Sequence, residues 1–346
     1  MSDQLRSEAP EVEQLGPAGG GAHKPFGWQA LRQSMRRVAR SNTEVLFPLG
    51  VLVVLFVTLS ILSPHFFTQE NLSNLLGEAS VLAIIAFGVT IVILAGHFDL
   101  SVGAGVALVG TVAGMVMVNT DSTLLGIAAG IGTGLALGAV NGVLVAYLLI
   151  PSFIATLAML VIARGLSLTI TDGRAVTGLP AGFTDFVSSS FLGITVATWI
   201  AAVVLLVLFV VLHRTRLGVE ILAVGGNAEA ARLSGLSVRW VQAAAFLISG
   251  AAVSIAGLVL TGRLATAQPN AAQLTELWSV AAVVLGGTSL YGGRGSVLWT
   301  VVGVLLIAVI QNGLTLENVN ADTQNIVLGT VFIAAALSGV IRRRTS

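Results

Sequence analysis

Long apolar runs separated by short polar segments are the feature that most limits how this chain can fold. A helix needs about 20 apolar residues to cross the hydrocarbon core of a membrane. Ten runs meet or approach that length: 45–62, 75–95, 100–118, 124–150, 153–170, 191–212, 241–260, 277–290, 297–314 and 326–341. Only 10% of the residues are charged and 55% are hydrophobic, whereas a soluble protein usually carries about a quarter charged residues. Because the runs are continuous and do not alternate, a transmembrane β-barrel is excluded. The sequence therefore predicts an all-α polytopic membrane protein with about ten transmembrane helices.

The lysines and arginines predict which side of the membrane each loop faces. With ten crossings and a cytoplasmic N-terminus, the C-terminus is cytoplasmic as well. All of the 17 Lys and Arg residues except Arg164, Arg174 and Arg263 then lie on the cytoplasmic side, as the positive-inside rule requires. Two runs are short or interrupted by glycine, one near Pro151 and one near 286–295, and both are candidates for half-helices.

The first 40 residues differ from the rest of the chain. Proline, glycine, serine and glutamate are frequent up to about Lys24, which predicts disorder. Residues 28–40 carry four arginines and are typical of a short amphipathic helix on the inner membrane surface. The polar stretch before the first apolar run is too long for a cleavable signal peptide. We expect a disordered, basic cytoplasmic tail over 1–40 and a transmembrane domain over 41–346.

One polar segment, 214–240, lies between two long apolar runs. It is rich in small residues and contains four arginines, Arg214, Arg216, Arg232 and Arg239. A polar helix with cationic flanks between two spans belongs in water on the cytoplasmic side. We expect a cytoplasmic partner to bind it.

Two glycine-rich interruptions, 96–105 and 286–296, break the apolar pattern, one in each half of the chain. Asp99 lies in the first, and a carboxylate near lipid must face protein, water or a partner. One interpretation is a surface loop in which Ser101 caps the next helix with Asp99 close to its positive end. The other is a broken helix that lines a transport pathway, because paired interruptions are typical of inverted repeats.

Three polar residues fall inside predicted spans. Arg164 is expected to pair with an acid or with backbone carbonyls, or to reach the membrane surface. Asn141 and Asn312, each followed by glycine, predict either hydrogen bonds between helices or the lining of a pathway.

Several kinds of chemistry have no support in the sequence. The chain has no Cys, so it forms no disulfide and has no thiol chemistry. His97 has no His or Cys neighbour at ligand spacing, and no metal site is expected. There is no phosphate-binding loop, so if ATP powers transport another subunit binds it. A net charge of +1 gives no sign of nucleic acid as a partner.

Several blocks of sequence occur together in one order. They are Gly96-x-x-Asp99-Leu-Ser-Val-Gly103, Asn141-Gly142, Pro151-Ser-Phe-Ile-Ala-Thr-Leu157, Arg164-Gly165, Gly225-Gly226-Asn227-x-Glu229-Ala230-Ala231-Arg232-x-Ser234-Gly235, Gly286-Gly287-Thr288-Ser289-Leu290-x-Gly292-Gly293-Arg294-Gly295-Ser296 and Asn312-Gly313-Leu314. Together they resemble the permease subunits of bacterial ABC importers for sugars of the ribose, xylose and galactose type. The chain departs from that pattern at Trp278, where the family usually has an acid.

The resemblance implies a fold and a set of partners. The fold is the ten-span type II importer fold in the bacterial inner membrane, surrounded by lipid. The partners are a second permease copy, a cytoplasmic ATPase subunit that binds ATP and Mg, and a periplasmic or lipid-anchored sugar-binding protein. The permease itself binds no cofactor and is not an enzyme.

The resemblance also implies roles for individual residues. The ATPase is expected to dock on an element comprising Gly226, Asn227, Glu229, Ala230, Ala231, Arg232 and Gly235. The residues expected to line the translocation pathway are Gly96, Asp99, Ser101, Asn141, Glu276, Thr288 and Asn312.

Three other functions are compatible with parts of the sequence. The first is a related ABC permease for a nucleoside, a branched-chain amino acid or a signalling furanosyl compound. The second is an ion-coupled secondary transporter with Asp99 as the ion or proton site, which leaves segment 214–240 without a role. The third is an integral-membrane enzyme, which the scattered acids do not favour.

Overall fold

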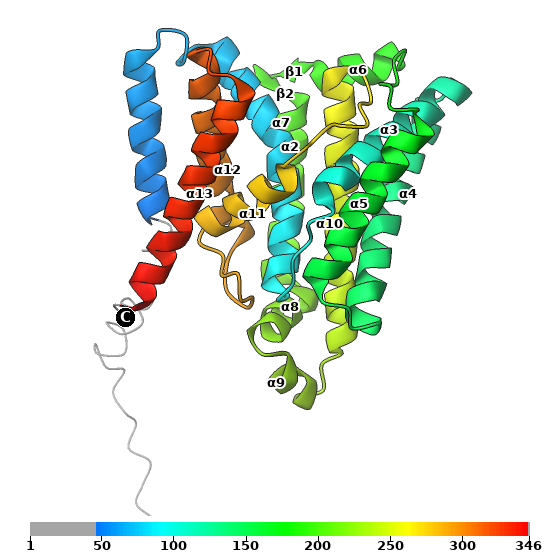
Figure 1. Ribbon diagram of the computed structural model, residues 1–346, viewed down its shortest axis with the longest axis vertical. Helices are drawn as coiled ribbons and strands as arrows, with labels where there is room; N and C mark the ends of the chain where they lie inside the picture. The colour runs from blue at the N-terminus through cyan, green and yellow to red at the C-terminus, as the bar shows by residue number, and fades with distance from the viewer. Residues whose placement is uncertain (1–45, 345–346) are drawn as a thin grey trace, which may run out of the picture. The chain divides into compact units, whose positions relative to one another are not determined.

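The computed structural model describes the backbone of residues 46–344 and the side chains of residues 46–333. A first helix, Leu46–Leu62, precedes the labelled elements of Figure 1. The labelled helices are α2 (Gln69–Leu94), α3 (Val102–Thr120), α4 (Thr123–Gly142) with a π-helical turn η1 (Val143–Tyr147), α5 (Ser152–Ile170), α6 (Ala181–Ser188), α7 (Val196–Arg214), α8 (Arg216–Gly226), α9 (Ala228–Leu233), α10 (Val238–Leu264), α11 (Thr275–Leu285), α12 (Val297–Leu316) and α13 (Ala321–Arg344). The predicted tail, 1–40, lies outside the described residues.

Seven helices are long and apolar enough to cross a membrane, and they confirm a polytopic helical membrane protein. They are α2, α3, α4 with η1, α5, α7, α10 and α12. Two apolar helices in the described part of the chain are shorter, Leu46–Leu62 and α11. With 11 residues, α11 is only about 16 Å long, so the half-helix predicted near 286–295 is confirmed. The half-helix considered near Pro151 is wrong, because α5 has 19 residues and Pro151 only starts it.

The predicted span 191–212 begins later in the structure. Strands β1 (Ser190–Phe191) and β2 (Ile194–Thr195) form a small antiparallel hairpin before α7. The two residues between them, Leu192 and Gly193, both have positive φ, 55° and 76°, as tight hairpin turns require. The apolar residues at the start of the predicted span therefore belong to the hairpin, and α7 starts at Val196.

A row of glycines determines how α4 packs. Five buried glycines recur every fourth residue, Gly126, Gly130, Gly134, Gly138 and Gly142. At Gly138 an added Cβ would lie 2.5 Å from the Phe246 carbonyl oxygen and 3.0 Å from the Gly250 Cα. The α4 and α10 backbones therefore touch, as small residues allow between helices in lipid. In Figure 1, α10 runs between α2 and α4 and packs on both.

Helices α8 and α9 lie together at one end of the bundle, beyond the ends of α2 and α10 (Figure 1). They occupy most of segment 214–240, which was predicted as a polar helix. The structure replaces one helix with two short ones, because Asn227 between them is extended, with φ −162° and ψ 98°. We call this the α8–α9 end of the bundle.

Candidate functional site

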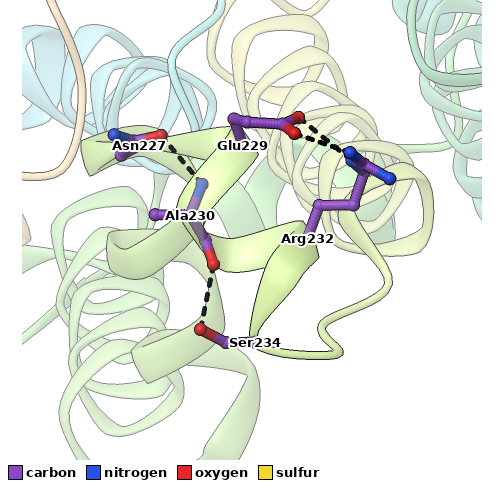
Figure 2. A network of polar contacts seen from close by, with 5 residues as sticks. All are labelled: Asn227, Glu229, Ala230, Arg232 and Ser234. Carbon is purple, nitrogen blue, oxygen red and sulfur yellow. Dashed lines mark hydrogen bonds and ion pairs between the residues drawn. The ribbon is translucent and has the colours of Figure 1, made fainter. Parts of the chain in front are cut away.

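Helix α9 is the most exposed helical element of the α8–α9 end, and Figure 2 shows its polar contacts. The Asn227 side-chain oxygen accepts a hydrogen bond from the Ala230 amide at 2.9 Å and so caps the helix. Ala231 is the buried residue of α9. Glu229 and Arg232 face solvent with about two thirds of each side chain exposed, 65% and 64%.

Glu229 and Arg232, one helical turn apart, form a bidentate ion pair. Arg232 Nη2 donates to Glu229 Oε1 at 2.6 Å and Arg232 Nε donates to Oε2 at 3.0 Å. The hydrogen bonds from Arg232 hold the pKa of the Glu229 carboxyl below its ordinary value. Because the pKa is depressed, the stabilising effect of the ion pair is fully present above the ordinary carboxyl pKa. It is lost only as the pH falls through the lowered value. The surface therefore keeps a fixed charge pattern near neutral pH.

Gly235 ends this element. Its φ of +86° is left-handed, a conformation that favours glycine after a helix. The Gly235 amide donates to the Arg232 carbonyl at 3.0 Å, and the Leu236 amide donates to the Ala231 carbonyl at 3.1 Å. These bonds close the last turn of α9. Asn227 and Gly235 thus fix the two ends of α9, between which all the residues predicted for ATPase docking lie except Gly226, the last residue of α8.

Four glycines, which we call the glycine junction, join α8 to both interruptions of the apolar pattern: Gly96, Gly225, Gly292 and Gly293. Gly225 lies against the Leu94 carbonyl oxygen, at the end of α2, with no room for a Cβ. At Gly292 a Cβ would meet the Gly225 oxygen at 2.7 Å and the Gly96 Cα at 2.9 Å. The Gly293 amide donates to the Leu94 carbonyl at 3.0 Å. The two interruptions, distant in sequence, therefore meet on one end of α8.

Asp99 lies inside the bundle and not in a surface loop, so the surface interpretation is wrong: the carboxylate is only 2% exposed. Its Oδ1 accepts from the Ser101 amide at 3.1 Å and from Ser101 Oγ at 2.6 Å. Its Oδ2 accepts from Ser249 Oγ at 2.8 Å, and Asn141 Nδ2 donates to Ser101 Oγ at 2.8 Å. These four residues from three parts of the fold form the Asp99 cluster.

The remaining predicted pathway residues lie apart from the Asp99 cluster. Asn312 on α12 exchanges two amide hydrogen bonds of 2.9 Å with Asn71 on α2, so the interhelical interpretation is confirmed for it. Thr288 is buried beside Gly295, and its hydroxyl has no partner among the described residues. Glu276, on the first turn of α11, lies against Gly103 at the start of α3.

Arg164 binds backbone, one of the partners expected for it. Its Nη1 donates to the Pro269 and Ala271 carbonyls, both at 2.9 Å. These carbonyls belong to the non-helical segment 265–274, which connects α10 to α11. In the predicted topology the segment lies between the spans 241–260 and 277–290, on the same side of the membrane as Arg263.

The sequence did not predict which residues Asp99, Asn312 and Arg164 bond. Two of these partners, Ser249 and Asn71, are single polar residues, and no motif around them indicates which residue they bond. The folding of 265–274 back into the bundle was missed because the segment is too polar to register as a span. In the described residues, no three of the His, Cys, Asp and Glu side chains are grouped in a way that could hold a metal ion.

Interrupted helices inside an apolar bundle, with both interruptions in contact with α8 of the exposed α8–α9 pair, are typical of the class of membrane permeases. The chain belongs to the family described as the permease component of branched-chain amino acid transport systems, which matches residues 71–336. It is a multi-pass membrane transport subunit and not an enzyme.

Its relatives include several sugar permeases. The ribose import permease protein RbsC of Escherichia coli (strain K12) is 42% identical, over 83% of this chain and 90% of the relative. The L-arabinose ABC transporter permease protein AraH of Azospirillum brasilense is 39% identical, over 85% and 86%. The D-allose transport system permease protein AlsC of Escherichia coli (strain K12) is 38% identical, over 84% and 88%. No solved structure matches the chain.

Proposed function

We propose that this protein is the permease subunit of an ATP-driven importer that carries a monosaccharide, such as ribose, xylose or galactose, across the bacterial inner membrane by alternating access. The relatives named for ribose, L-arabinose and D-allose support this over a nucleoside, an amino acid or a furanosyl signal. They also support it over an ion-coupled carrier and a membrane enzyme. The external sugar-binding protein would deliver the sugar.

The proposed topology has ten crossings with both termini in the cytoplasm. The first helix, the seven long helices and α13 would supply nine crossings. Segment 265–274 and half-helix α11 together would supply the tenth. This arrangement puts α8, α9 and Arg294 on the cytoplasmic side, in agreement with the arginine distribution of the sequence.

The glycine junction is the observation that carries the proposal. Helix α9 is the docking surface for the ATPase, which binds ATP and Mg, and α8 touches both interruptions at Gly96 and at Gly292–Gly293. A movement of α9 caused by the ATPase would therefore be transmitted through α8 to both interruptions, 96–105 and 286–296. Backbone contacts without side chains transmit such a movement, because packed interfaces are not continuously deformable.

Two permease copies would enclose the pathway between them. We propose that six of the seven predicted residues frame it, Gly96, Asp99, Ser101, Asn141, Glu276 and Thr288, whereas Asn312 joins α12 to α2. Gly96, Asp99 and Ser101 lie on the first break of the bundle, whereas Glu276 is on the first turn of the half-helix α11 and Thr288 follows its end. Broken helices with polar residues at midplane are the usual construction of transport sites.

The test is co-purification of the ATPase with a tagged permease in mild detergent. Glu229→Arg replaces the ion pair with two like charges on the docking surface, and we expect it to abolish recovery of the ATPase. The matched control is Glu317→Arg, the same change on an exposed acid beyond the end of α12, which should retain the ATPase. Full recovery with Glu229→Arg in a properly inserted protein would contradict the docking assignment.

A further inference from the structure

Segment 265–274 carries an observation that the proposed function does not use. Its side chains include three amides, Gln268, Asn270 and Gln273, and all three are exposed. None of them makes a side-chain hydrogen bond within the described residues. The inference built on them rests on the proposed function.

Contacts with α3 show how deep the segment lies. Ala267 packs against Gly114, while the Ala272 carbonyl packs against Gly103 near the first residue of α3. Eleven helical residues separate these two glycines, a rise of about 16 Å. The segment therefore descends about half the thickness of a hydrocarbon core, which is about 30 Å.

Arg164 holds the segment in this position. The residue lies six positions before the end of α5 at Ile170, or about 9 Å below it. Its guanidinium donates hydrogen bonds to the Pro269 and Ala271 carbonyls, which would accept from backbone amides if the segment were helical. Ala267 exchanges two further backbone bonds with Val176, at 2.9 and 3.0 Å. The backbone of the segment is thus fixed from two sides, and its amide side chains are left free.

Exposed amides at this depth need a polar environment. Non-helical backbone at membrane depth occurs where it is buried in protein or lines a water-filled cavity. An unpaired primary amide facing lipid would forfeit its donors and its acceptor. The three amides therefore face water or a partner.

We propose that Gln268, Asn270 and Gln273 form an amide face that hydrogen-bonds the hydroxyl groups of a polyhydroxylated solute during transit, with Arg164 as a positioning residue. Amides both donate and accept, as sugar hydroxyls do. A few placed polar groups on a mostly apolar wall are typical of sites for small molecules. Because three neutral amides hold no fixed charge, they permit release as well as binding.

The natural absence of Cys makes the test direct. We would introduce Gln273→Cys and Asn270→Cys one at a time into the full complex, with the ATPase and the sugar-binding protein, in membrane vesicles. The rate of modification by a charged, membrane-impermeant thiol reagent would be measured with and without ribose. The control is Asn119→Cys, an exposed amide near the end of α3 and away from the segment.

We expect both segment variants to react with the charged reagent, and ribose under turnover conditions to slow the reaction severalfold, while Asn119→Cys is unaffected by ribose. Failure of the charged reagent to reach both variants, with a lipid-soluble maleimide still reacting, would show that the face contacts lipid. That result would overturn the amide face.

A second measurement separates this inference from the proposed function. ATP-dependent ribose uptake is measured in the unmodified complex. Uptake of ribose without protection of either variant overturns the amide face and leaves the proposed function standing. Absence of uptake for every sugar tried overturns the proposed function, and the amide face fails with it.

Discussion

Two segments break the helical bundle near the start of α3, and they treat their polar groups in opposite ways. In the link before α3, Asp99 and Ser101 are almost completely buried, and they are hydrogen-bonded to each other, to Asn141 of α4 and to Ser249 of α10. In segment 265–274, the backbone is held by Arg164 while three amides stay exposed. The first arrangement fixes a shape. The second leaves polar side chains available to water or to a bound molecule. Mutations in the link before α3 should therefore lower stability, whereas mutations that affect segment 265–274 should lower transport.

The largest expected effect tests whether the Asp99 cluster is structural. Asp99→Ala leaves three donors from Ser101 and Ser249 without an acceptor, and unsatisfied buried groups cost about 1–3 kcal/mol each. We expect a loss of at least about 3 kcal/mol in stability, measured as a lower midpoint of thermal unfolding in detergent and a lower yield of inserted protein. Asp185→Ala, on an exposed position of α6, is the control. Normal unfolding and normal uptake by Asp99→Ala would remove the contrast between the two breaks.

An intermediate effect is expected at the glycine junction, where the first break meets α8. Gly225→Ala places a methyl group against the Leu94 carbonyl, and such overpacking costs about 1–3 kcal/mol. Gly132→Ala on α4 has no atom within 4 Å of the new methyl group and is the matched control. We expect Gly225→Ala to lower the ratio of sugar transported to ATP hydrolysed, and Gly132→Ala to keep it. Equal ratios for the two variants would show that the junction transmits nothing.

The smallest effect on stability, with a large effect on transport, is expected at Arg164. Arg164→Ala removes two hydrogen bonds to carbonyls beside amides that face water, so water can replace the guanidinium and the cost is about 1–3 kcal/mol, at a net value of about 0.5–1.5 kcal/mol per bond. Because the segment then loses its position, we expect uptake to fall far more than the unfolding midpoint. Arg174→Ala, an exposed arginine after α5, controls for loss of charge. A variant of Arg164 that unfolds as readily as Asp99→Ala would make the two breaks alike.

The sequence predicted the bundle better than the breaks within it. Continuous apolar runs fix where helices form, since each span needs nearly the same length, and α3, α10 and α12 follow the prediction within a few residues. The end of a run is less certain, as the hairpin before Val196 shows, because turn geometry at Leu192 and Gly193 overrides hydrophobicity.

The polar interior was only partly predictable. Asp99 and Arg164 were recognised because charge inside a span is costly, and Arg164 has the carbonyl partners expected of it. Ser249 was not recognised, since a serine in a helix carries no sign of its acceptor 150 positions earlier. Segment 265–274 was placed outside because hydropathy measures exposure to lipid, and a segment sheltered by protein need not be apolar.

The Asp99 cluster joins residues that are far apart in the sequence, and this separation sets the order in which the helices can assemble in the membrane. Ser249 is synthesised 150 residues after Asp99, a delay of roughly 8–30 s at the usual rate of translation. During that time the carboxylate has no α10 beside it, and Gly134 and Gly138 of α4 have no backbone to pack on. The first helices must therefore remain loosely associated, or be sheltered by the insertion machinery, until α10 enters and closes the bundle around them.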